Sequence, residues 1–327
     1  MKAVSLFSGG LDSQLAVCLI KDQGIEVVAV NFVTPFFGAE ERFGIAAQQL
    51  GIEYHEIDIG QPYMEILKHP IYGYGKNFNP CIDCHAFMLK NAGKYMEEIG
   101  AKFLFTGEVL GERPMSQNKS SLNAVEKTSG YRGLVLRPLS ALLLTPTIPE
   151  TEGWVNRSRL LDISGRSRSR QMQLADHYGL QDYPSPAGGC LLTQENYSKR
   201  LRQLLAAKPE AESGELEILK FGRHFYLEDN LLLVVGRNQT ENEALHRLAS
   251  GDDYLLKVVE RPGPLGLVRS LGVQGTVDLQ LPAGIVARYS DARELPQTEM
   301  VVNRPGDHQS IFITVRPLLP AEIPSPV

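Results

Sequence analysis

The first sixty residues alternate short β-branched runs with stretches of helical periodicity, and this alternation restricts the fold more than any other feature. The runs Lys2–Phe7, Glu26–Phe32 and Glu53–Ile57 predict buried strands, whereas Leu11–Asp22 and Glu40–Leu50 predict the helices between them. Strands that follow one another through helices are joined by right-handed crossovers and lie parallel, in a sheet covered on both faces. We therefore expect an α/β fold with a doubly wound parallel sheet.

The alternation continues further along the chain, with a helix predicted over Ala86–Ile99 and a strand over Lys102–Thr106. Proline-rich segments at Pro138–Glu152 and Tyr183–Gly189 predict loops. A helix predicted over Glu195–Ala207 then precedes an acidic, poorly patterned stretch. We interpret that stretch as a linker between two domains.

The first domain is thus expected to span residues 1–208, and residues 209–327 are expected to form a smaller α+β domain with a tail. Leu216–Val235 and Tyr254–Val259 predict strands around a helix near Glu241–Ala249. The tail is rich in Gly, Pro and Val and shows only short β-like pieces.

Size and composition suit two such domains. The chain has 327 residues, of which 43% are hydrophobic and 22% charged, enough to bury at least one large core. No run reaches the roughly 18 apolar residues of a membrane helix, and the start lacks a signal-peptide pattern, so we expect a soluble, cytoplasmic protein without a membrane partner. The formal net charge of −5 argues against non-specific coating of nucleic acid but permits a local basic surface.

A serine- and glycine-rich turn lies between the first predicted strand and the first predicted helix. At this position backbone amides and a positive helix end face the opening of the sheet, which suits a phosphate. Two glycines allow a tight turn, two serines can donate hydrogen bonds, and the aspartate can lie near a Mg²⁺ ion carried in by a nucleotide. The residues are Ser8, Gly9, Gly10, Asp12 and Ser13.

This SGGxDS turn after an N-terminal strand resembles the signature of PP-loop ATP pyrophosphatases. The resemblance implies a protein that binds ATP, splits it between the α and β phosphates, adenylates a substrate and holds the departing pyrophosphate in the turn. Asn31 and Phe32, at the end of the second predicted strand, resemble the family position that lines the adenine pocket. No GxxxxGKS/T motif occurs, which argues against γ-phosphoryl transfer.

Three of the four cysteines suggest a second feature of the site. Cys81 and Cys84 lie one turn apart where a helix opens, and Cys190 lies in a Pro- and Gly-rich segment that can reach back over the sheet. Three thiolates without a fourth suit a 4Fe-4S cluster with one open iron, whereas structural zinc is usually closed by four ligands. Cys18 falls on the apolar face of a predicted helix and reads as a packed core thiol.

A PP-loop paired with CxxC and a remote cysteine resembles the cluster-dependent branch of tRNA thiolation enzymes. The resemblance implies that Cys81, Cys84 and Cys190 bind the cluster and act in catalysis. Two alternatives stay open: a zinc site completed by His85, and a metal-free route, as in the related 2-thiouridylases, in which Cys190 carries a persulfide. Either a sulfide or a persulfide carrier would then be the sulfur donor.

Two further segments match thiouridine synthases. Thr106-Gly107-Glu108 resembles their TGE/TGD segment, which implies that Gly107 contacts the nucleotide and that Glu108 lies near the target base or the metal; an acid capping a turn is the plainer interpretation. An arginine-rich stretch resembles the ISGRSR segment and can bind phosphates of RNA, although a solvated helix start explains it too. Its arginines are Arg157, Arg159, Arg166, Arg168 and Arg170.

In the second predicted domain, Val235–Asn242 resembles the GRNxxEN motif of the NFACT-R type of RNA-associated module. The resemblance implies RNA contacts by Arg237 and Asn238, while a helix-capping asparagine is the alternative interpretation.

Together these features predict an ATP-dependent tRNA sulfurtransferase, in which a uridine carbonyl oxygen is adenylated and sulfur then displaces AMP. Two rival classes remain: an amide-forming PP-loop ligase, and a non-catalytic RNA-binding or sulfur-trafficking protein. The identity of the RNA, the modified base and the oligomeric state do not follow from the sequence.

Overall fold

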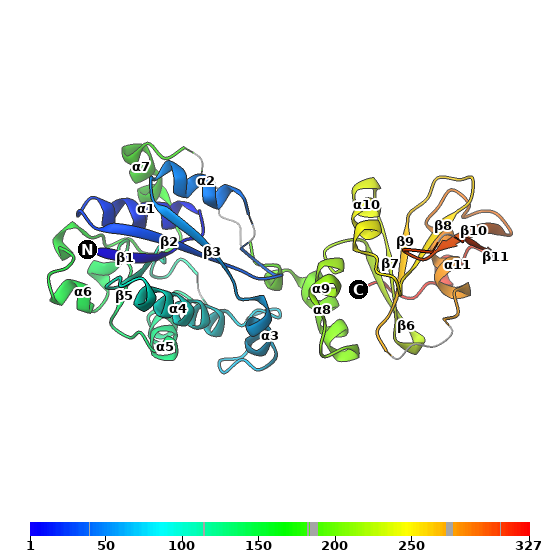
Figure 1. Cartoon of the computed structure of the whole chain (residues 1–327), viewed down its shortest axis with the longest axis horizontal. Coiled ribbons are helices and arrows are strands. Elements are labelled where there is room, and N and C mark those ends of the chain that lie inside the picture. Colours follow the sequence, from blue (N-terminus) through cyan, green and yellow to red (C-terminus); the bar gives the residue numbers. More distant parts are fainter. Residues whose placement is uncertain (39, 114, 182, 184–188, 273–276, 308) are drawn as a thin grey trace. The chain divides into compact units, whose positions relative to one another are not determined.

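The computed structural model describes residues 1–38, 40–113, 115–181, 183, 189–272, 277–307 and 309–327 (Figure 1). The chain divides into two compact units, Met1–Thr193 and Gln194–Val327. The predicted helix Glu195–Ala207 has the predicted bounds, and it lies in the second unit rather than ahead of a linker. In the described part of the chain, no helix is both long enough and apolar enough to cross a membrane.

The first unit is built on a five-stranded sheet in which every pair of neighbours is parallel, in the order β3-β2-β1-β4-β5. This confirms the predicted doubly wound α/β fold. The chain adds β2 and β3 on one side of β1 and then adds β4 on the other, so the order reverses between β1 and β4. Ligands of open α/β sheets bind at the carboxyl ends of strands at such a reversal. The strands are β1 (Lys2–Leu6), β2 (Glu26–Val33), β3 (Glu53–Asp58), β4 (Leu104–Thr106) and β5 (Val135–Leu136).

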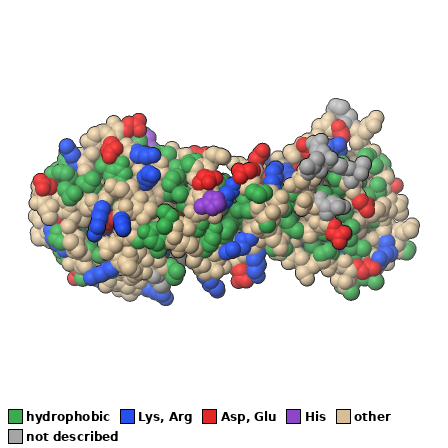
Figure 2. All heavy atoms as spheres, turned by 90° about the horizontal axis from the view of Figure 1, so that it is seen from below, with side chains coloured by type: hydrophobic (Ala, Val, Ile, Leu, Met, Phe, Trp, Pro, Cys, Tyr) green, Lys and Arg blue, Asp and Glu red, His purple; other side chains and the backbone are tan. Residues whose placement is uncertain are grey.

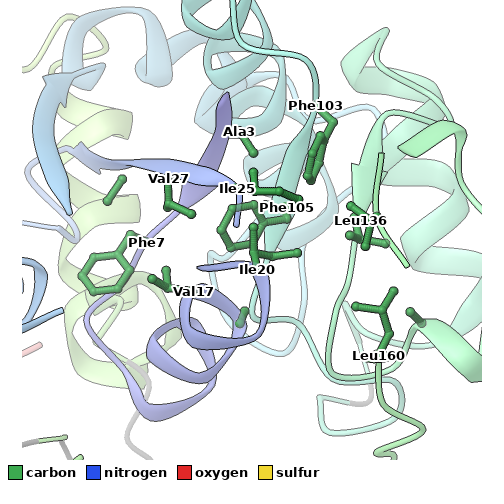
Figure 3. Packing of buried hydrophobic residues seen from close by; sticks show 14 of the residues in the cluster. Ala3, Phe7, Val17, Ile20, Ile25, Val27, Phe103, Phe105, Leu136 and Leu160 are labelled. Carbon is green, nitrogen blue, oxygen red and sulfur yellow. The ribbon is translucent and has the colours of Figure 1, made fainter. Parts of the chain in front are cut away.

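Both faces of this sheet are covered because its central strands alternate apolar residues between two clusters. Ala3 and Phe105 pack with Ile20 of α1 on one face (Figure 3). On the other face, Val4 and Leu104 pack against α4 and α5. The helices of the unit are α1 (Leu11–Lys21), α2 (Arg42–Gln49), α3 (Gly60–Lys68), α4 (Cys81–Glu98), α5 (Lys119–Ser129), α6 (Ile148–Thr151) and α7 (Ser169–Tyr178), with short 3-10 turns at Ala141–Leu143, Arg157–Arg159 and Leu191–Thr193.

The segment Pro138–Glu152, predicted as a loop, contains a 3-10 turn and the short helix α6. A capping box forms at the start of α6, where the backbone N–H and hydroxyl of Thr147 donate to Glu150. Pro149 falls in the first turn, where its missing N–H removes no helical hydrogen bond. The prolines therefore start a helix here instead of excluding one.

The second unit carries a six-stranded antiparallel sheet in the order β11-β10-β8-β9-β7-β6. Its strands are β6 (Arg223–Leu227), β7 (Leu231–Val235), β8 (Tyr254–Val258), β9 (Gly266–Ser270), β10 (Thr298–Asn303) and β11 (Ile311–Val315). Its helices are α8 (Glu195–Ala207), α9 (Ser213–Ile218), α10 (Gln239–Leu248) and α11 (Gln280–Arg288), with 3-10 turns at Glu228–Asn230 and Pro320–Glu322. The predicted smaller α+β domain is thus present.

Two helices of this unit were wrongly predicted as irregular chain. The acidic stretch contains α9, whose capping box joins Glu212 and Glu215. The tail contains α11, in which Pro282 is the third residue, so its missing N–H breaks no helical bond. Ile285 and Val286 of α11 are fully buried in the core of the unit, and this burial outweighs the low helix propensity of the segment.

Candidate functional site

The SGGxDS turn lies directly after β1 and opens α1, as predicted. Gly9 has φ +63°, a conformation that strains other residues, and Gly10 is the N-cap of α1. Ser13 Oγ donates to Gly10 O at 2.8 Å, and Ser8 Oγ lies 3.4 Å from Ser13 Oγ. The turn therefore leaves the first amides of α1 and two hydroxyl groups at the carboxyl edge of the sheet, which is a site for an anion.

Gly107 touches this turn from the neighbouring strand β4. A Cβ atom added to Gly107 would lie 2.5 Å from Asp12 C and 2.5 Å from Ser13 N, closer than real contacts allow. Only glycine fits here, because Gly107 packs directly against the turn that is predicted to bind the nucleotide. The sheet order explains the approach, because β1 and β4 are neighbours.

Asp12 lies in the first turn of α1, where a helix dipole favours a negative charge. Burial raises the pKa of its carboxyl group above the usual value, and nearby Arg168 and Arg113 offset only part of this effect. Glu112 shows the same rise, caused by burial and by the neighbouring charge of Asp12. Two carboxylates facing each other at an anion site are electrostatically costly unless a cation such as Mg²⁺ joins them.

The three cysteines of the predicted sulfur site come together in the first unit. Cys81 opens α4, Cys84 is buried one turn later, and Cys190 precedes a 3-10 turn. Cys190 and Cys81 lie close enough to Cys84 to raise the pKa of its thiol further, beyond the larger rise caused by burial. The remote thiol is therefore a neighbour of the CxxC pair, and we name Cys81, Cys84 and Cys190 the thiol cluster.

Hydrogen bonds to the backbone of residues 190–193, and from it, hold Cys190 in this position. Leu191 N donates to Phe36 O at 3.0 Å, which ties the segment to the loop after β2. Asn77 Nδ2 donates to Thr193 O at 2.6 Å, which ties it to the loop before α4. Thr193 Oγ1 in turn donates to Cys190 O at 2.7 Å. Residues 184–188 of the Pro- and Gly-rich segment lie outside the described residues.

Two side chains besides the cysteines contact the thiol cluster. Asn79 Nδ2 donates to Cys81 Sγ at 3.0 Å. Tyr63, a buried residue of α3, hydrogen-bonds Cys84 and lies near all three thiols. Burial raises the pKa of Cys190 to about 11, an effect that the Leu192 and Thr193 amides and Arg113 partly offset.

The fit of a metal to the thiol cluster can be judged from its side chains. Three thiols are a donor set typical of an iron–sulfur centre. Among the described residues, however, no group of three or more His, Cys, Asp or Glu side chains is arranged to hold a metal ion. Asp83 is not available as an extra ligand, since both its oxygens accept backbone N–H groups, from Ile71 and Tyr72. The site is thus not a preformed metal centre, and the predicted cluster and its zinc alternative stay predictions.

Glu108 lies at the centre of a buried chain of charges. Its Oε1 lies 2.9 Å from His85 Nδ1, and its Oε2 accepts from Thr106 Oγ1 at 3.1 Å and from Arg137 Nε at 3.0 Å. Arg137 also pairs with Glu126. Burial alone would raise the pKa of Glu108, but Arg137 and His85 lower it to about 2. Glu108 is therefore an ionised group that holds His85, next to Cys84.

Asn31 and Phe32, predicted at an adenine pocket, are both buried. Phe32 is 3% exposed and packs in the core between the sheet and α4. Asn31 Nδ2 donates to Gly38 O at 2.6 Å, so this side chain shapes the loop after β2. Their contact with adenine stays a prediction, and what the structure gives these two side chains is a packing role.

The predicted arginine patch separates into differently placed residues. Arg157 pairs with Glu150 and donates to Leu144 O, and Arg170 binds Asp162 at 2.7 Å. Arg159 and Arg166 are exposed. Arg168, at the start of α7, lies beside Asp12. On the face shown in Figure 2, described Lys and Arg side chains are spread among neutral and hydrophobic ones.

Arg237 and Asn238 both stabilise the start of α10. Asn238 Oδ1 accepts Glu241 N at 2.9 Å as an N-cap, and Arg237 Nε donates to Glu241 Oε1 at 2.9 Å. Asn242 Oδ1 accepts Leu265 N at 3.0 Å. The GRNxxEN motif is therefore a helix-start motif in this unit. The Arg237 side chain remains 47% exposed, so its predicted RNA contact stays open.

Sequence reasoning missed three site residues. Tyr63 belongs to no motif, and in the sequence it is only one of several apolar residues with helical spacing. Arg137 and Gln171 are buried polar residues just outside the segments that the sequence analysis singled out, and their partners lie far away in the sequence. Only the three-dimensional fold brings Arg137 to Glu108 and Gln171 to Asp12.

Comparison with known families follows the division of the chain. Residues 1–143 match the family described as thiamine biosynthesis protein (ThiI), and residues 222–325 match the family described as NFACT protein RNA binding domain. Both matches confirm the resemblances predicted from the sequence motifs.

Curated relatives match part of this chain. A probable tRNA sulfurtransferase of Thermococcus kodakarensis is 32% identical over 150 residues, 43% of this chain and 37% of the relative. A tRNA-specific 2-thiouridylase MnmA of Pelobacter propionicus is 31% identical over 120 residues, 33% of each chain. The chain thus spans about a third of the length of the curated relatives it matches.

Among solved structures, a 4-thiouridine synthetase–RNA complex with bound ATP is 26% identical, covering 42% of this chain and 36% of that one, with a TM-score of 0.35. The chain therefore joins a segment similar to the ThiI family, at residues 1–143, to a segment similar to the NFACT RNA binding domain, at residues 222–325.

Proposed function

We propose that this protein is an ATP-dependent tRNA sulfurtransferase that replaces a uridine carbonyl oxygen by sulfur. One observation supports this above all: the dipeptide Gly107–Glu108 links the two halves of the site. Gly107 packs against Asp12 and Ser13 of the phosphate turn, and Glu108 holds His85, next to Cys84 of the thiol cluster. Adenylation and sulfur chemistry would thus occur at neighbouring positions. Relatives named as tRNA sulfurtransferases and 2-thiouridylases support the substrate class.

The first step follows from the anion site. The uridine carbonyl oxygen attacks the α-phosphorus of ATP, an O–P bond forms, the α–β anhydride bond breaks, and pyrophosphate leaves. The amides and hydroxyls at Gly9–Ser13 would hold the leaving pyrophosphate, and Asp12 would bind the Mg²⁺ that neutralises it. The carbonyl carbon becomes reactive because its oxygen now leaves as AMP.

The second step follows from the thiol cluster. A persulfide on Cys190, supplied by a persulfide-carrying donor, attacks the activated carbon through its terminal sulfur, and AMP leaves. The thiolate of Cys81 or Cys84 then attacks Cys190 Sγ, which releases the thiolated base and forms a disulfide. A dithiol reductant restores the two thiols. Free cysteines of this kind need a reducing compartment, so we place the reaction in the cytoplasm.

The 4Fe-4S cluster remains the competing proposal for the sulfur site. The three thiols have the right chemistry, but the described side chains form no group ready to hold a metal, which favours the persulfide route. Anaerobic purification with iron and sulfide analysis separates the two. About four iron atoms per chain would establish the cluster and overturn the persulfide route, whereas iron-free protein that still thiolates tRNA would exclude the cluster.

The second unit is proposed to bind the RNA. Its match to the NFACT protein RNA binding domain supports this role, and Arg237 offers a half-exposed guanidinium group for a phosphate. The predicted RNA contacts by Arg159 and Arg166 of the first unit remain proposals of the same kind, since both are exposed.

The test is the stoichiometry of the reaction. Purified protein is given ATP, Mg²⁺, tRNA and a persulfide donor; pyrophosphate and AMP are quantified, and digested tRNA is examined by mass spectrometry. We expect pyrophosphate release that depends on tRNA, with one AMP for each thionucleoside. Pyrophosphate release that depends instead on ammonia and a carboxylate would identify an amide-forming ligase. If no pyrophosphate were released under either condition, the proposed ATP-dependent reaction would be excluded.

A further inference from the structure

The strand β11 forms one edge of the antiparallel sheet in the second unit (Figure 1). Among the described residues it pairs only with β10, through five consecutive residues without a bulge. None of its residues, Ile311–Val315, carries a charge. Ile311 and Phe312 are each 56% exposed. A regular, uncharged and apolar edge strand of this kind readily pairs with a strand of another molecule.

The other sheet edges in the described part of the chain are protected. β3 carries three acidic side chains in six residues, and β5 is only two residues long. β6 is partly covered, because Val327 N donates to His224 O at 3.0 Å. Arg200 Nε donates to Val327 O at 3.0 Å and holds that segment in place. Charge, shortness and cover are the usual ways to keep edge strands from pairing, and β11 has none of them.

The hydrophobic core of the second unit is incomplete at β11. Val315 is buried, and Ile313 lies opposite the buried Met300 and packs against the same core. Ile311 lies opposite the buried Val302, yet it is exposed. Side chains two residues apart on a strand share a face, so these three β11 side chains point to the same side of the sheet. Another strand beside β11 would therefore extend this core and cover Ile311.

The lack of charge on β11 indicates which kind of partner fits. A nucleic acid is bound mainly through cations, and β11 has none. Arg316, the residue after the strand, is already paired with Glu322 at 2.8 Å. An uncharged apolar strand is the complementary partner, and each further copy of this chain carries one. Oligomers of identical chains are most often two-fold symmetric, with the same surface used by both copies.

We propose that two copies of this chain associate through β11, so that their antiparallel sheets join into one. In a two-fold antiparallel pair centred on Ile313, Ile311 lies opposite Val315 of the other copy. Phe312 then lies opposite Thr314 of the other copy, and no charge is buried. A five-residue strand pair is smaller than a standard interface of about 800 Å² a side, so the dimer is weak and reversible.

Sedimentation velocity of the full chain, over a wide range of protein concentrations, tests the proposal. We expect the average mass to rise with concentration from that of one chain toward that of two. The experiment contains neither ATP nor tRNA, so it does not depend on the proposed reaction.

Two double variants test the register. In Phe312→Lys with Thr314→Lys, each lysine would face a lysine of the other copy, whereas in Phe312→Glu with Thr314→Lys each would face an opposite charge. Both positions are exposed in the single chain, and Thr314 lies opposite Glu299, which suits a lysine in both variants. We expect the second variant to dimerise at least about fivefold more tightly than the first. Circular dichroism and the melting temperature check that both variants are folded.

Each outcome bears on the proposal. A wild type that stays a single chain at every concentration would overturn it. Equal dimerisation of the two double variants would place the contact on another surface and would overturn it too. Weaker tRNA binding by Phe312→Ser, with no dimer in the wild type, would assign the strand to RNA instead. A dimer without tRNA thiolation would leave this inference standing while the sulfurtransferase proposal fails, and thiolation by a single chain would do the reverse.

Discussion

Glu108 Oε1 lies 2.9 Å from His85 Nδ1, a contact that joins the turn after β4 to the start of α4. An ionised carboxylate can only accept a hydrogen bond, so Nδ1 of His85 is the donor in this contact. Arg137 binds the other oxygen, so both oxygens of Glu108 are already engaged by groups of the protein. We therefore regard Glu108 as a residue that positions His85 beside Cys84.

The acid stability of the protein should depend on Glu108. Its folded-state pKa of about 2 lies below the ordinary value of 4.5, so its stabilising effect is full above the ordinary value and disappears as the pH falls toward 2. Urea unfolding between about pH 5 and pH 3 should show a loss of unfolding free energy in the wild type and a smaller loss in Glu108→Gln. Glu98→Gln, at an exposed position of α4, is the matched control and should behave like the wild type.

The cysteines should separate the two steps of the reaction. Cys190→Ser removes the proposed persulfide carrier but leaves the phosphate turn intact, so thionucleoside formation should fall below detection while tRNA-dependent pyrophosphate release persists. Cys18→Ala is the control, because Cys18 is buried in α1 away from the proposed chemistry. It should cost about 1 kcal/mol of stability and keep thiolation. Full activity in Cys190→Ser would contradict the thiol mechanism.

The reactivity of Cys190 should depend on Arg113. Burial raises the pKa of the Cys190 thiol to about 11, although the positive charge of Arg113 acts in the opposite direction. Removing Arg113 should therefore raise the thiol pKa further. Alkylation of Cys190 by iodoacetamide, followed by mass spectrometry, should increase with pH up to about that value, because the thiolate is the nucleophile. The profile of Arg113→Gln should lie at higher pH than that of Arg132→Gln. Superimposed profiles would show that Arg113 does not act on the thiol.

The sequence was sufficient to predict those parts of the fold that depend on interactions between residues close together in the chain. The strand–turn–helix around Gly9 and Gly10 follows from β-branched residues, glycine conformation and helical periodicity, all of which act over a few residues. The tail was missed because its helix depends on distant contacts: α11 packs so closely on the segment near Arg316 that a Cβ on Gly284 would lie 3.2 Å from Arg316 O, a crowded contact. Propensity alone reads that glycine as a helix breaker.

The candidate site shows the same division. The spacing of Cys81 and Cys84 identified a sulfur pair, but the approach of Cys190 depends on a bond from Leu191 N to Phe36 O across the fold. Arginines of one short segment looked like one surface in the sequence, yet Arg168 turns toward Asp12. Arginines that are neighbours in the sequence need not share a surface, because the burial and the partners of each side chain decide its role.

The second unit offers a test of the GRNxxEN motif. Asn238→Ala removes the N-cap acceptor for Glu241 N and should lower the stability of the second unit by about 1 kcal/mol. Asn238→Ser supplies another capping oxygen and should restore most of it, with tRNA affinity equal to that of the wild type. Weaker tRNA binding by a stable Asn238→Ser protein, measured by fluorescence anisotropy, would instead show that the Asn238 amide contacts RNA.

Gly107→Ala should disable the nucleotide site without removing any chemical group. The new methyl carbon would lie 2.5 Å from Asp12 C and Ser13 N, so either the phosphate turn or the end of β4 must move. We expect magnesium ATP binding to weaken at least about tenfold, since misplaced donors lose most of their hydrogen-bond energy. Gly214→Ala is the matched control, because a Cβ there meets no atom within 4 Å and its φ is not positive. Circular dichroism of both variants checks the fold. If Gly107→Ala kept its structure and bound ATP as tightly as the wild type, the close approach of β4 to the phosphate turn would have no part in nucleotide binding.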